Sequence, residues 1–248
     1  MKIGLIGFGN IGSFLASKLG KRINWVVDCD DGALKRMRKL GLTCPFYKEI
    51  PRGCEGVQLV VEAASQEAVP LLEECLEYCD VMIMSVGALT DDLLKERLYR
   101  KAKQHGRKIY IPSGAIGGLD AISSLRGKIK SVLLETYKPP SSLGRKDAER
   151  KIVFEGSARE ACALYPKNIN VAATLSLAGI GMQKTKVRII SDPAAKNIVH
   201  KIFVKSVAGK IEMIFDNLPS KHNPKTSMLA ALSALDTIKK IEEEILIG

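Results

Sequence analysis

The feature that most constrains the fold is a glycine-rich turn between an apolar run and an amphipathic stretch at the start of the chain. KIGLIGF (2–8) has the continuous apolar pattern of a buried strand, and NIGSFLASKLGK (10–21) has helical periodicity. The turn between them, GFGNIG (7–12), has the spacing G-x-G-x-x-G, which indicates dinucleotide binding when it joins a strand to a helix. The chain is therefore predicted to begin with the first βα unit of a nucleotide-binding sheet.

Each residue of this turn has its own predicted part in binding. Gly7 permits the tight turn, Gly9 removes a side chain from the path of the pyrophosphate, and Gly12 lets the helix pack closely on the strand. Asn10 and Ile11 open the helix, where free N–H groups attract phosphate. We expect these five residues to contact a dinucleotide.

The end of the second predicted strand, INWVVD (23–28), indicates which dinucleotide this is. Asp28 stands about 20 residues beyond the glycines, where an acidic residue accepts hydrogen bonds from the adenosine ribose. Its charge, strengthened by Asp30, would repel the 2′-phosphate of NADP. NAD is therefore the predicted cofactor, while Lys35 and Arg36 keep NADP open as an alternative.

Strands and helices alternate as far as residue 112. The further predicted strands are VQLVVEAA (57–64), VMIMSVG (81–87) and KIYIPSG (108–114), and DDLLKERLYRKAKQHG (91–106) is predicted to form a charged amphipathic helix. Near-continuous apolar strands that alternate with helices are typical of a parallel sheet covered on both faces. We predict an α/β fold with a Rossmann-type dinucleotide-binding domain over residues 1–112.

The remaining chain predicts a second, α+β domain over residues 113–223, for substrate binding, catalysis and dimerisation. KIKSVLLETYK (128–138), TKVRIISD (185–192), HKIFVKSVAG (200–209) and KIEMIFDN (210–217) are its predicted strands, and EGSAREACALYP (155–166) and NINVAATLSLAGIG (168–181) its predicted helices. Gly209 predicts a hairpin between the last two strands, so the sheet should be mostly antiparallel. The segment 224–248 is predicted to form a helix that packs back on the first domain.

The composition argues against several other classes of protein. The net charge is +11, but the basic residues are scattered and no nucleic-acid-binding motif accompanies them, so we expect no nucleic-acid partner. The six cysteines form no CxxC pair or Cys/His cluster, so no metal site is predicted. No apolar run approaches the ~20 residues that span a bilayer. We expect a cytoplasmic protein without a membrane partner.

Four stretches in the second half of the chain give the strongest indication of function. They are IPSGAIGGLDAI (111–122), NINVAATLSLAG (168–179), DPAAKNIVHKI (192–202) and NPKTSMLAALSAL (223–235). Together with VEAASQEAV (61–69) and MSVGAL (84–89), they resemble the L-aspartate dehydrogenase family over nearly the whole chain. SGAIGGLDA and NPKTSxLAALSA are the most specific of these motifs.

The resemblance implies a reaction and its partners. Such enzymes oxidise L-aspartate with NAD or NADP to iminoaspartate, which hydrolyses to oxaloacetate and ammonia, and they also run in reverse. The iminoaspartate can feed quinolinate and hence NAD synthesis. We also expect a homodimer through the sheet of the second domain, because an antiparallel sheet has a face or edge to cover.

The resemblance also implies site residues. The family histidine of the segment D-x-x-x-x-N-[IV]-H corresponds to His200, although this chain has one extra residue, Val199, before it. Ala115 and Asn170 correspond to nucleotide contacts. Two further cofactor contacts are assigned within VEAAS and MSVGAL, namely Ala64 and Ser85.

His200 can also be interpreted from its own strand. With a period of two, it shares one apolar face with Ile202 and Val204, so the imidazole should point inward. The catalytic interpretation is a general acid/base that activates the water attacking the imine, because the ordinary pKa of histidine is near ~6.5. The alternative is a buried structural histidine. His105, in a charged helix end, and His222, in a loop, compete less well.

A dicarboxylate substrate requires cations or hydrogen-bond donors in its pocket. Lys225 and Thr226, at the start of the last predicted helix, and Ser113 are the predicted substrate-binding residues. Two other functions stay open. One is another two-domain enzyme, similar to homoserine dehydrogenase or dihydrodipicolinate reductase, and the other is a catalytically silent NAD-binding sensor.

Overall fold

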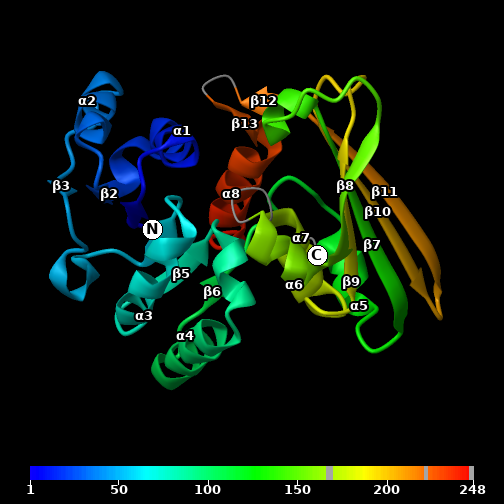
Figure 1. Cartoon of the computed structure of the whole chain (residues 1–248). Helices are drawn as coiled ribbons and strands as arrows, with labels where there is room; N and C mark the ends of the chain where they lie inside the picture. The colour runs from blue at the N-terminus through cyan, green and yellow to red at the C-terminus, as the bar shows by residue number, and fades with distance from the viewer. Residues whose placement is uncertain (166–169, 221–222, 246–248) are drawn as a thin grey trace. The chain divides into compact units, whose positions relative to one another are not determined.

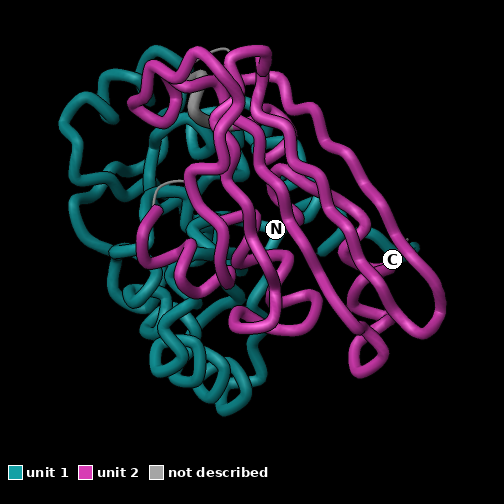
Figure 2. The backbone as a smooth tube through the Cα atoms, turned by 45° about the vertical axis from the view of Figure 1, so that its right-hand side comes forward, with its two compact units in different colours: residues 1–112, 231–247 teal, residues 113–230, 248 magenta. Residues whose placement is uncertain are grey.

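The computed structural model describes residues 1–165, 170–220 and 223–245, and the side chains of residues 223–226 lie outside that description. The chain divides into two compact units (Figures 1 and 2). The first unit is formed by residues 1–112 and 231–247, and the second by residues 113–230.

A six-stranded sheet forms the centre of the first unit, in the order β3-β2-β1-β4-β5-β6. Its strands are β1 (Ile3–Ile6), β2 (Ile23–Val27), β3 (Phe46–Tyr47), β4 (Leu59–Glu62), β5 (Asp80–Ile83) and β6 (Ile109–Tyr110). Every neighbouring pair is parallel. All residues of β1 and β4 are buried, as expected for strands covered on both faces. The strand order is that of a Rossmann-type sheet, which confirms the predicted fold class.

Helices and short 3₁₀ segments connect these strands. They are α1 (Asn10–Leu19), η1 (Gly20–Arg22), α2 (Asp31–Lys39), η2 (Arg52–Cys54), η3 (Gln66–Leu71), α3 (Leu72–Cys75), η4 (Val86–Thr90) and α4 (Asp92–His105). The ends of α4 follow from local chemistry. The Asp91 carboxylate accepts hydrogen bonds from the backbone N–H groups of Leu93 and Leu94, and Gly106 ends the helix at a φ of 63°.

The last helix, α8 (Met228–Lys240), completes the core of the first unit. Ala234 and Ile238 belong to the same hydrophobic cluster as the apolar residues of β1 and α1. Glu242, just beyond the helix, accepts hydrogen bonds from the N-terminal ammonium (2.9 Å) and from Arg22 (2.7 Å). The first unit is therefore built from two segments that are far apart in the sequence.

The predicted helix over 224–248 begins too early. Residues Asn223–Ser227 form a strand, β13, which pairs antiparallel with β12 (Pro219–Ser220). Pro224 favours an extended conformation for Asn223, and the helix starts where the Ser227 hydroxyl accepts a hydrogen bond from the Leu229 N–H (3.1 Å).

The second unit contains a five-stranded sheet in the order β11-β10-β7-β9-β8. Its strands are β7 (Ile129–Lys138), β8 (Lys151–Ser157), β9 (Thr185–Ser191), β10 (Ile198–Ser206) and β11 (Gly209–Asn217). Only β7 and β9 are parallel, and the other three pairs are antiparallel. This confirms the predicted mostly antiparallel sheet. The predicted hairpin is also confirmed, because β10 and β11 are joined at Ser206 and Gly209.

Three helices lie on one side of this sheet, α5 (Leu119–Ser124), α6 (Ala158–Leu164) and α7 (Asn170–Ala178) (Figure 1). A 3₁₀ segment, η5 (Pro140–Leu143), follows β7. The predicted helix over 155–166 is shorter than expected, because its first residues complete β8. Ser157 then caps α6 in a capping box with Glu160.

The two faces of the sheet differ in burial. Val132 and Leu134 of β7 and Ile202 and Val204 of β10 are buried on one face, whereas Leu133 and Phe203, on the opposite face, are half-buried. We call the face that bears Val132 and Ile202 the inner face of the sheet.

Candidate active site

The glycine turn lies between β1 and α1, at the carboxyl ends of the parallel strands. Gly7 has a φ of +92°, and a Cβ there would lie 2.6 Å from the Ala64 Cα. A Cβ on Gly12 would overlap the carbonyl oxygen of Gly7. By contrast, a Cβ on Gly9 would meet nothing within 4 Å. Gly7 and Gly12 are thus required by the packing of the protein, while Gly9 leaves open space at the N-terminus of α1, as a bound pyrophosphate requires.

Asp28 lies next to this turn and is held by the backbone. Its Oδ2 accepts a hydrogen bond from the Phe8 N–H (2.6 Å) and its Oδ1 one from the Asp30 N–H (2.7 Å). Because each carboxylate oxygen has a second acceptor site, Asp28 can still accept ribose hydroxyls. Arg36 lies close by, where its guanidinium donates to the Phe8 carbonyl (3.3 Å) and to Asp30 (2.9 Å).

A buried carboxylate joins the loops that follow β4 and β5. Glu62, the last residue of β4, is fully buried. Its Oε1 accepts hydrogen bonds from the Ala64 N–H (2.8 Å) and the Ser85 hydroxyl (2.8 Å), and its Oε2 accepts one from the Ser85 N–H (2.9 Å). Burial raises the pKa of Glu62, and the hydrogen bonds oppose that effect. Glu62 thereby brings together Ala64 and Ser85, which were predicted as separate cofactor contacts.

His200 lies on β10 with its side chain on the inner face of the second unit's sheet. Its Nδ1 is 3.0 Å from the hydroxyl oxygen of Thr136, the residue that it pairs with on β7. Burial, and to a smaller extent the positive charge of Lys138, lowers the pKa of His200 to about 3. The imidazole is therefore neutral at neutral pH. When Nδ1–H donates to Thr136, Nε2 is left as a base.

Lys138 is a second ionisable group on this inner face, two residues beyond Thr136 on β7. Its exposed fraction is 4%, and among the lysines and arginines whose side chains the structure describes it is the only buried one. Burial lowers its pKa to about 8. A lysine cation therefore lies beside a neutral histidine. A buried ionisable cluster of this kind is typical of functional sites.

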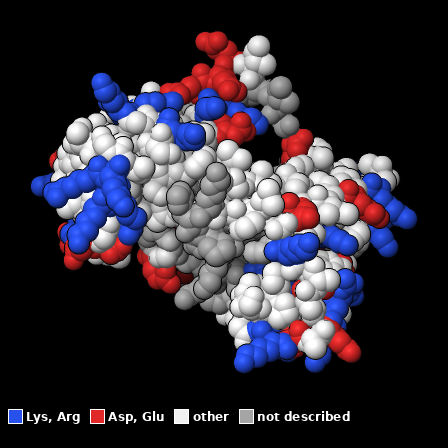
Figure 3. Space-filling model, turned by 90° about the horizontal axis from the view of Figure 1, so that it is seen from above, with Lys and Arg blue, Asp and Glu red and all other residues white. Residues whose placement is uncertain are grey.

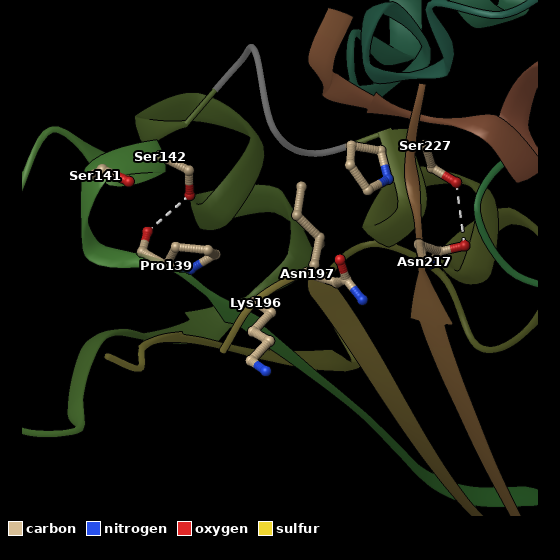
Figure 4. Close-up of a pocket in the computed structure, with 9 residues that line it drawn as sticks. Pro139, Ser141, Ser142, Lys196, Asn197, Asn217 and Ser227 are labelled. Atoms are coloured by element: carbon tan, nitrogen blue, oxygen red, sulfur yellow. Dashed lines mark hydrogen bonds between the residues drawn. The ribbon is translucent and has the colours of Figure 1, made fainter. Parts of the chain in front are cut away.

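A cavity of about 250 Å³ opens at the same end of the sheet (Figure 4). It is lined by Pro139, Ser141, Ser142, Lys196, Asn197, Ile198, Asn217, Pro219 and Ser227. Asn217 organises one wall of it. Its Nδ2 donates to the Ala115 carbonyl (2.9 Å), and its Oδ1 accepts from the Ser227 hydroxyl (3.0 Å). Asn217 thus ties the predicted nucleotide-binding loop at Ala115 to the start of α8.

The remaining predicted site residues are less closely grouped. Ser113 and Ala115 are half-buried in the loop before α5, and Asn170 is exposed at the start of α7. Lys225 and Thr226 have side chains outside the described residues, as does the whole of His222.

Sequence reasoning missed Glu62, Thr136, Lys138 and Asn217. Two of them had a signal in the sequence. Glu62 is an acidic residue at the end of an apolar strand, and Lys138 continues the alternation of inward-facing residues along its own strand.

In the parts of the chain that the structure describes, no group of three or more His, Cys, Asp or Glu side chains is placed to hold a metal ion. No described helix is long and apolar enough to cross a membrane. On the face shown in Figure 3, lysine and arginine side chains lie in several separate groups, with acidic side chains among them.

Comparison with known protein families matches both halves of the chain. Residues 7–112 match the family described as homoserine dehydrogenase, NAD binding domain, and residues 120–241 match aspartate dehydrogenase, C-terminal. The L-aspartate dehydrogenase of Methanosarcina acetivorans is 40% identical, with 100% of this chain and 99% of the relative covered. The L-aspartate dehydrogenase of Thermotoga maritima is 37% identical, with all of both chains covered.

Solved structures of dehydrogenases also match this chain. The crystal structure of aspartate dehydrogenase from Thermotoga maritima matches with a TM-score of 0.86 and 35% identity, covering 100% of this chain and 99% of that one. A hyperthermophilic archaeal homoserine dehydrogenase in complex with NADPH has a TM-score of 0.57 at 14% identity, covering 99% and 98% of the two chains. The second likeness is one of fold alone.

Proposed function

The chain belongs to the L-aspartate dehydrogenase family and is an amino-acid dehydrogenase, and we propose that its substrate is L-aspartate. The proposed products are iminoaspartate and, after hydrolysis, oxaloacetate and ammonia, in a reversible reaction. The observation that carries the proposal is the 40% identity to an L-aspartate dehydrogenase over the full length of both chains. The buried pair of His200 and Lys138 beside a cavity supports it.

We propose NAD as the preferred cofactor. Gly7, Gly9 and Gly12, with Asn10 and Ile11, would hold the pyrophosphate at the start of α1. Asp28 would accept the ribose hydroxyls, and its charge would disfavour a 2′-phosphate. Arg36, 2.9 Å from Asp30, is the cation that would allow use of NADP. The further proposed contacts are Ala64, Ser85, Ala115 and Asn170. When bound, the pyridine nucleotide supplies a hydride acceptor.

The proposed role of His200 is proton transfer during hydrolysis of the imine. A neutral imidazole whose Nδ1–H donates to Thr136 presents Nε2 as a base. Nε2 accepts a proton from the water that attacks the imine carbon, and returns a proton to the nitrogen that leaves as ammonia. In the reverse direction the same group assists loss of water from the carbinolamine.

The test is to mix the purified protein with L-aspartate and NAD at mildly alkaline pH and to follow NADH absorbance. We expect NADH from the wild type and a loss of at least ~10²-fold in His200→Ala, the scale of general acid/base catalysis. His105→Ala, on α4, is the matched control and should keep the wild-type rate.

Two outcomes would change the proposal. Equal rates in wild type and His200→Ala would retain the reaction but leave His200 with a structural role. If NAD binds but no NADH forms from L-aspartate, another substrate or a silent NAD-binding sensor replaces the proposed function.

The proposed assembly is a homodimer, and the proposed use of the product is to supply quinolinate and NAD synthesis. The face of the second unit's sheet opposite His200 carries half-buried Leu133, Val199 and Phe203, and a second copy would cover them. Light scattering of the purified protein tests the assembly, and the mass of a single chain would contradict it. The cytoplasmic location stays a prediction.

A further inference from the structure

A dicarboxylate substrate brings two negative charges to the site, so the cation that receives them decides how the substrate is recognised. We propose that the Lys138 ammonium binds one of the two substrate carboxylates. This inference rests on the proposed function, because it takes L-aspartate as the substrate. It assigns to Lys138 the role that the sequence had suggested for Lys225.

Strand register places Lys138 between the cavity and His200. On β10 and β11, Ile198 pairs with Asn217, and both residues line the cavity. Tyr137 of β7 pairs with Val199, so Lys138, one residue further along β7, comes level with Ile198. The neighbouring row on the inner face contains Thr136 and His200. Lys138 is thus adjacent to a residue of the cavity wall on one side and to the proposed base on the other.

Burial makes Lys138 an effective binding group. Charges attract each other more strongly where water is excluded, and a charged hydrogen bond to a carboxylate is stronger than a neutral one. Asp192, which is also buried, forms an ion pair with Arg150 through contacts of 2.9 and 2.8 Å. The Lys138 backbone carbonyl accepts the Asp192 N–H (2.9 Å), which fixes this end of β7.

Other cations near the cavity are placed less well for this role. Lys196 lines the cavity but is exposed, and Figure 4 shows its amine directed away from Asn217 and Ser227. Lys201 lies on the opposite face of the sheet, 4.9 Å from the ring centre of Tyr137. The side chain of Arg150 is exposed and pairs with Asp192. Among the cations with described side chains, Lys138 is therefore the one that combines burial with a place on the inner face.

The experiment measures recognition of charge separately from turnover. Succinate and its monoamide, succinamate, differ by one carboxylate, and their dissociation constants are measured by calorimetry on the NAD-loaded protein. We expect the wild type to bind succinate at least ~10-fold more tightly than succinamate, the scale of one charged hydrogen bond. Lys138→Met should bind succinate and succinamate about equally tightly. Its KM for L-aspartate should rise at least ~10-fold, with a smaller change in kcat. Lys138→Arg, which keeps the charge, should recover part of the preference.

Matched variants separate a binding role from a structural one. Lys130→Met, on an exposed residue of the same strand, should keep the wild-type preference for succinate. Lys196→Met tests the rival cation on the cavity wall. Lys138→Gln serves as a second neutral variant, and a thermal melt of each variant verifies its folding. A preference for succinate that persists in both Lys138→Met and Lys138→Gln overturns the proposal, as does its loss in Lys196→Met alone. If the wild type neither oxidises L-aspartate nor binds succinate, it is the proposed function that fails.

Discussion

At the scale of single residues, His200 and Lys138 are two ionisable groups on the same buried face of the sheet. Burial lowers both pKa values, that of His200 to about 3 and that of Lys138 to about 8. Near neutral pH the lysine is therefore charged and the histidine is neutral, so the inner face holds one cation and one neutral imidazole.

The low pKa of His200 predicts a pH-dependent stability. Between its ordinary pKa of 6.5 and its folded pKa of about 3, the unfolded chain binds a proton that the folded chain does not. The free energy of unfolding should therefore fall as the pH is lowered through this range, by about 1.4 kcal/mol per pH unit. Urea denaturation followed by circular dichroism checks this. In His200→Gln, the free energy of unfolding should fall less steeply as the pH is lowered, because unfolding then binds one proton fewer. Equal slopes in the two proteins would contradict the lowered pKa of His200.

We expect the replacement of Lys138 to stabilise the folded protein and to weaken substrate binding. The pKa of Lys138 falls from 10.5 to about 8, so below pH 8 protonation of the amine costs about 3 kcal/mol more in the folded chain than in the unfolded chain. Lys138→Met should raise the free energy of unfolding by up to that amount at pH 7, while it weakens substrate binding. The gain should shrink between pH 8 and 10.5, where the wild-type lysine loses its proton in the folded state. A Lys138→Met protein that is less stable than the wild type at pH 7 would contradict this prediction.

The sequence predicted the placement of residues correctly where a pattern is local. The position of the glycine turn between β1 and α1, the position of Asp28 beside it and the inward orientation of His200 all follow from spacing within one strand or turn. Lys138 was missed because a lysine at the end of a strand resembles a solvated residue. Thr136 was missed because its partner His200 is 64 residues away, and only the register of two strands brings them together.

At the scale of elements, Glu62 links the ends of β4 and β5. Glu62→Gln replaces one acceptor oxygen by an amide group that cannot accept the Ser85 N–H. A buried donor without a partner costs ~1–3 kcal/mol. We expect a loss of that size in urea denaturation and weaker NAD binding, because the loops of Ala64 and Ser85 lose their shared anchor. Glu49→Gln, at an exposed site in the same unit, is the control. Unchanged NAD affinity in Glu62→Gln would argue that these loops do not contact the cofactor.

The predicted elements were most reliable where one apolar pattern fills the whole element. The buried parallel strands and α4 are of this kind. The strand Lys151–Ser157 was missed because its residues are mostly half-buried or exposed, so they show no strong alternation. The start of α8 was placed too early because Asn223–Ser227 is polar and pairs only with the two residues of β12.

At the scale of the whole molecule, substitutions in α8 test whether this helix stabilises the first unit. Ile238 is fully buried in the cluster formed with β1 and α1. Ile238→Ala should lower the free energy of unfolding by ~2–5 kcal/mol. The single tryptophan, Trp25, is buried in β2, so its fluorescence follows this unit. Leu232→Ala, at a 46%-exposed residue of the same helix, should cost much less. Equal losses in the two variants would contradict the described packing of α8.

The return of α8 also sets an order for biosynthesis. Residues 113–230 form one continuous unit, whereas the first unit needs residues 231–247 to complete its core. While residues 231–247 are still inside the ribosome, Ala234 and Ile238 cannot join the hydrophobic cluster of β1 and α1. The half of the protein that is translated first can therefore complete its core only after the last helix has been made and released.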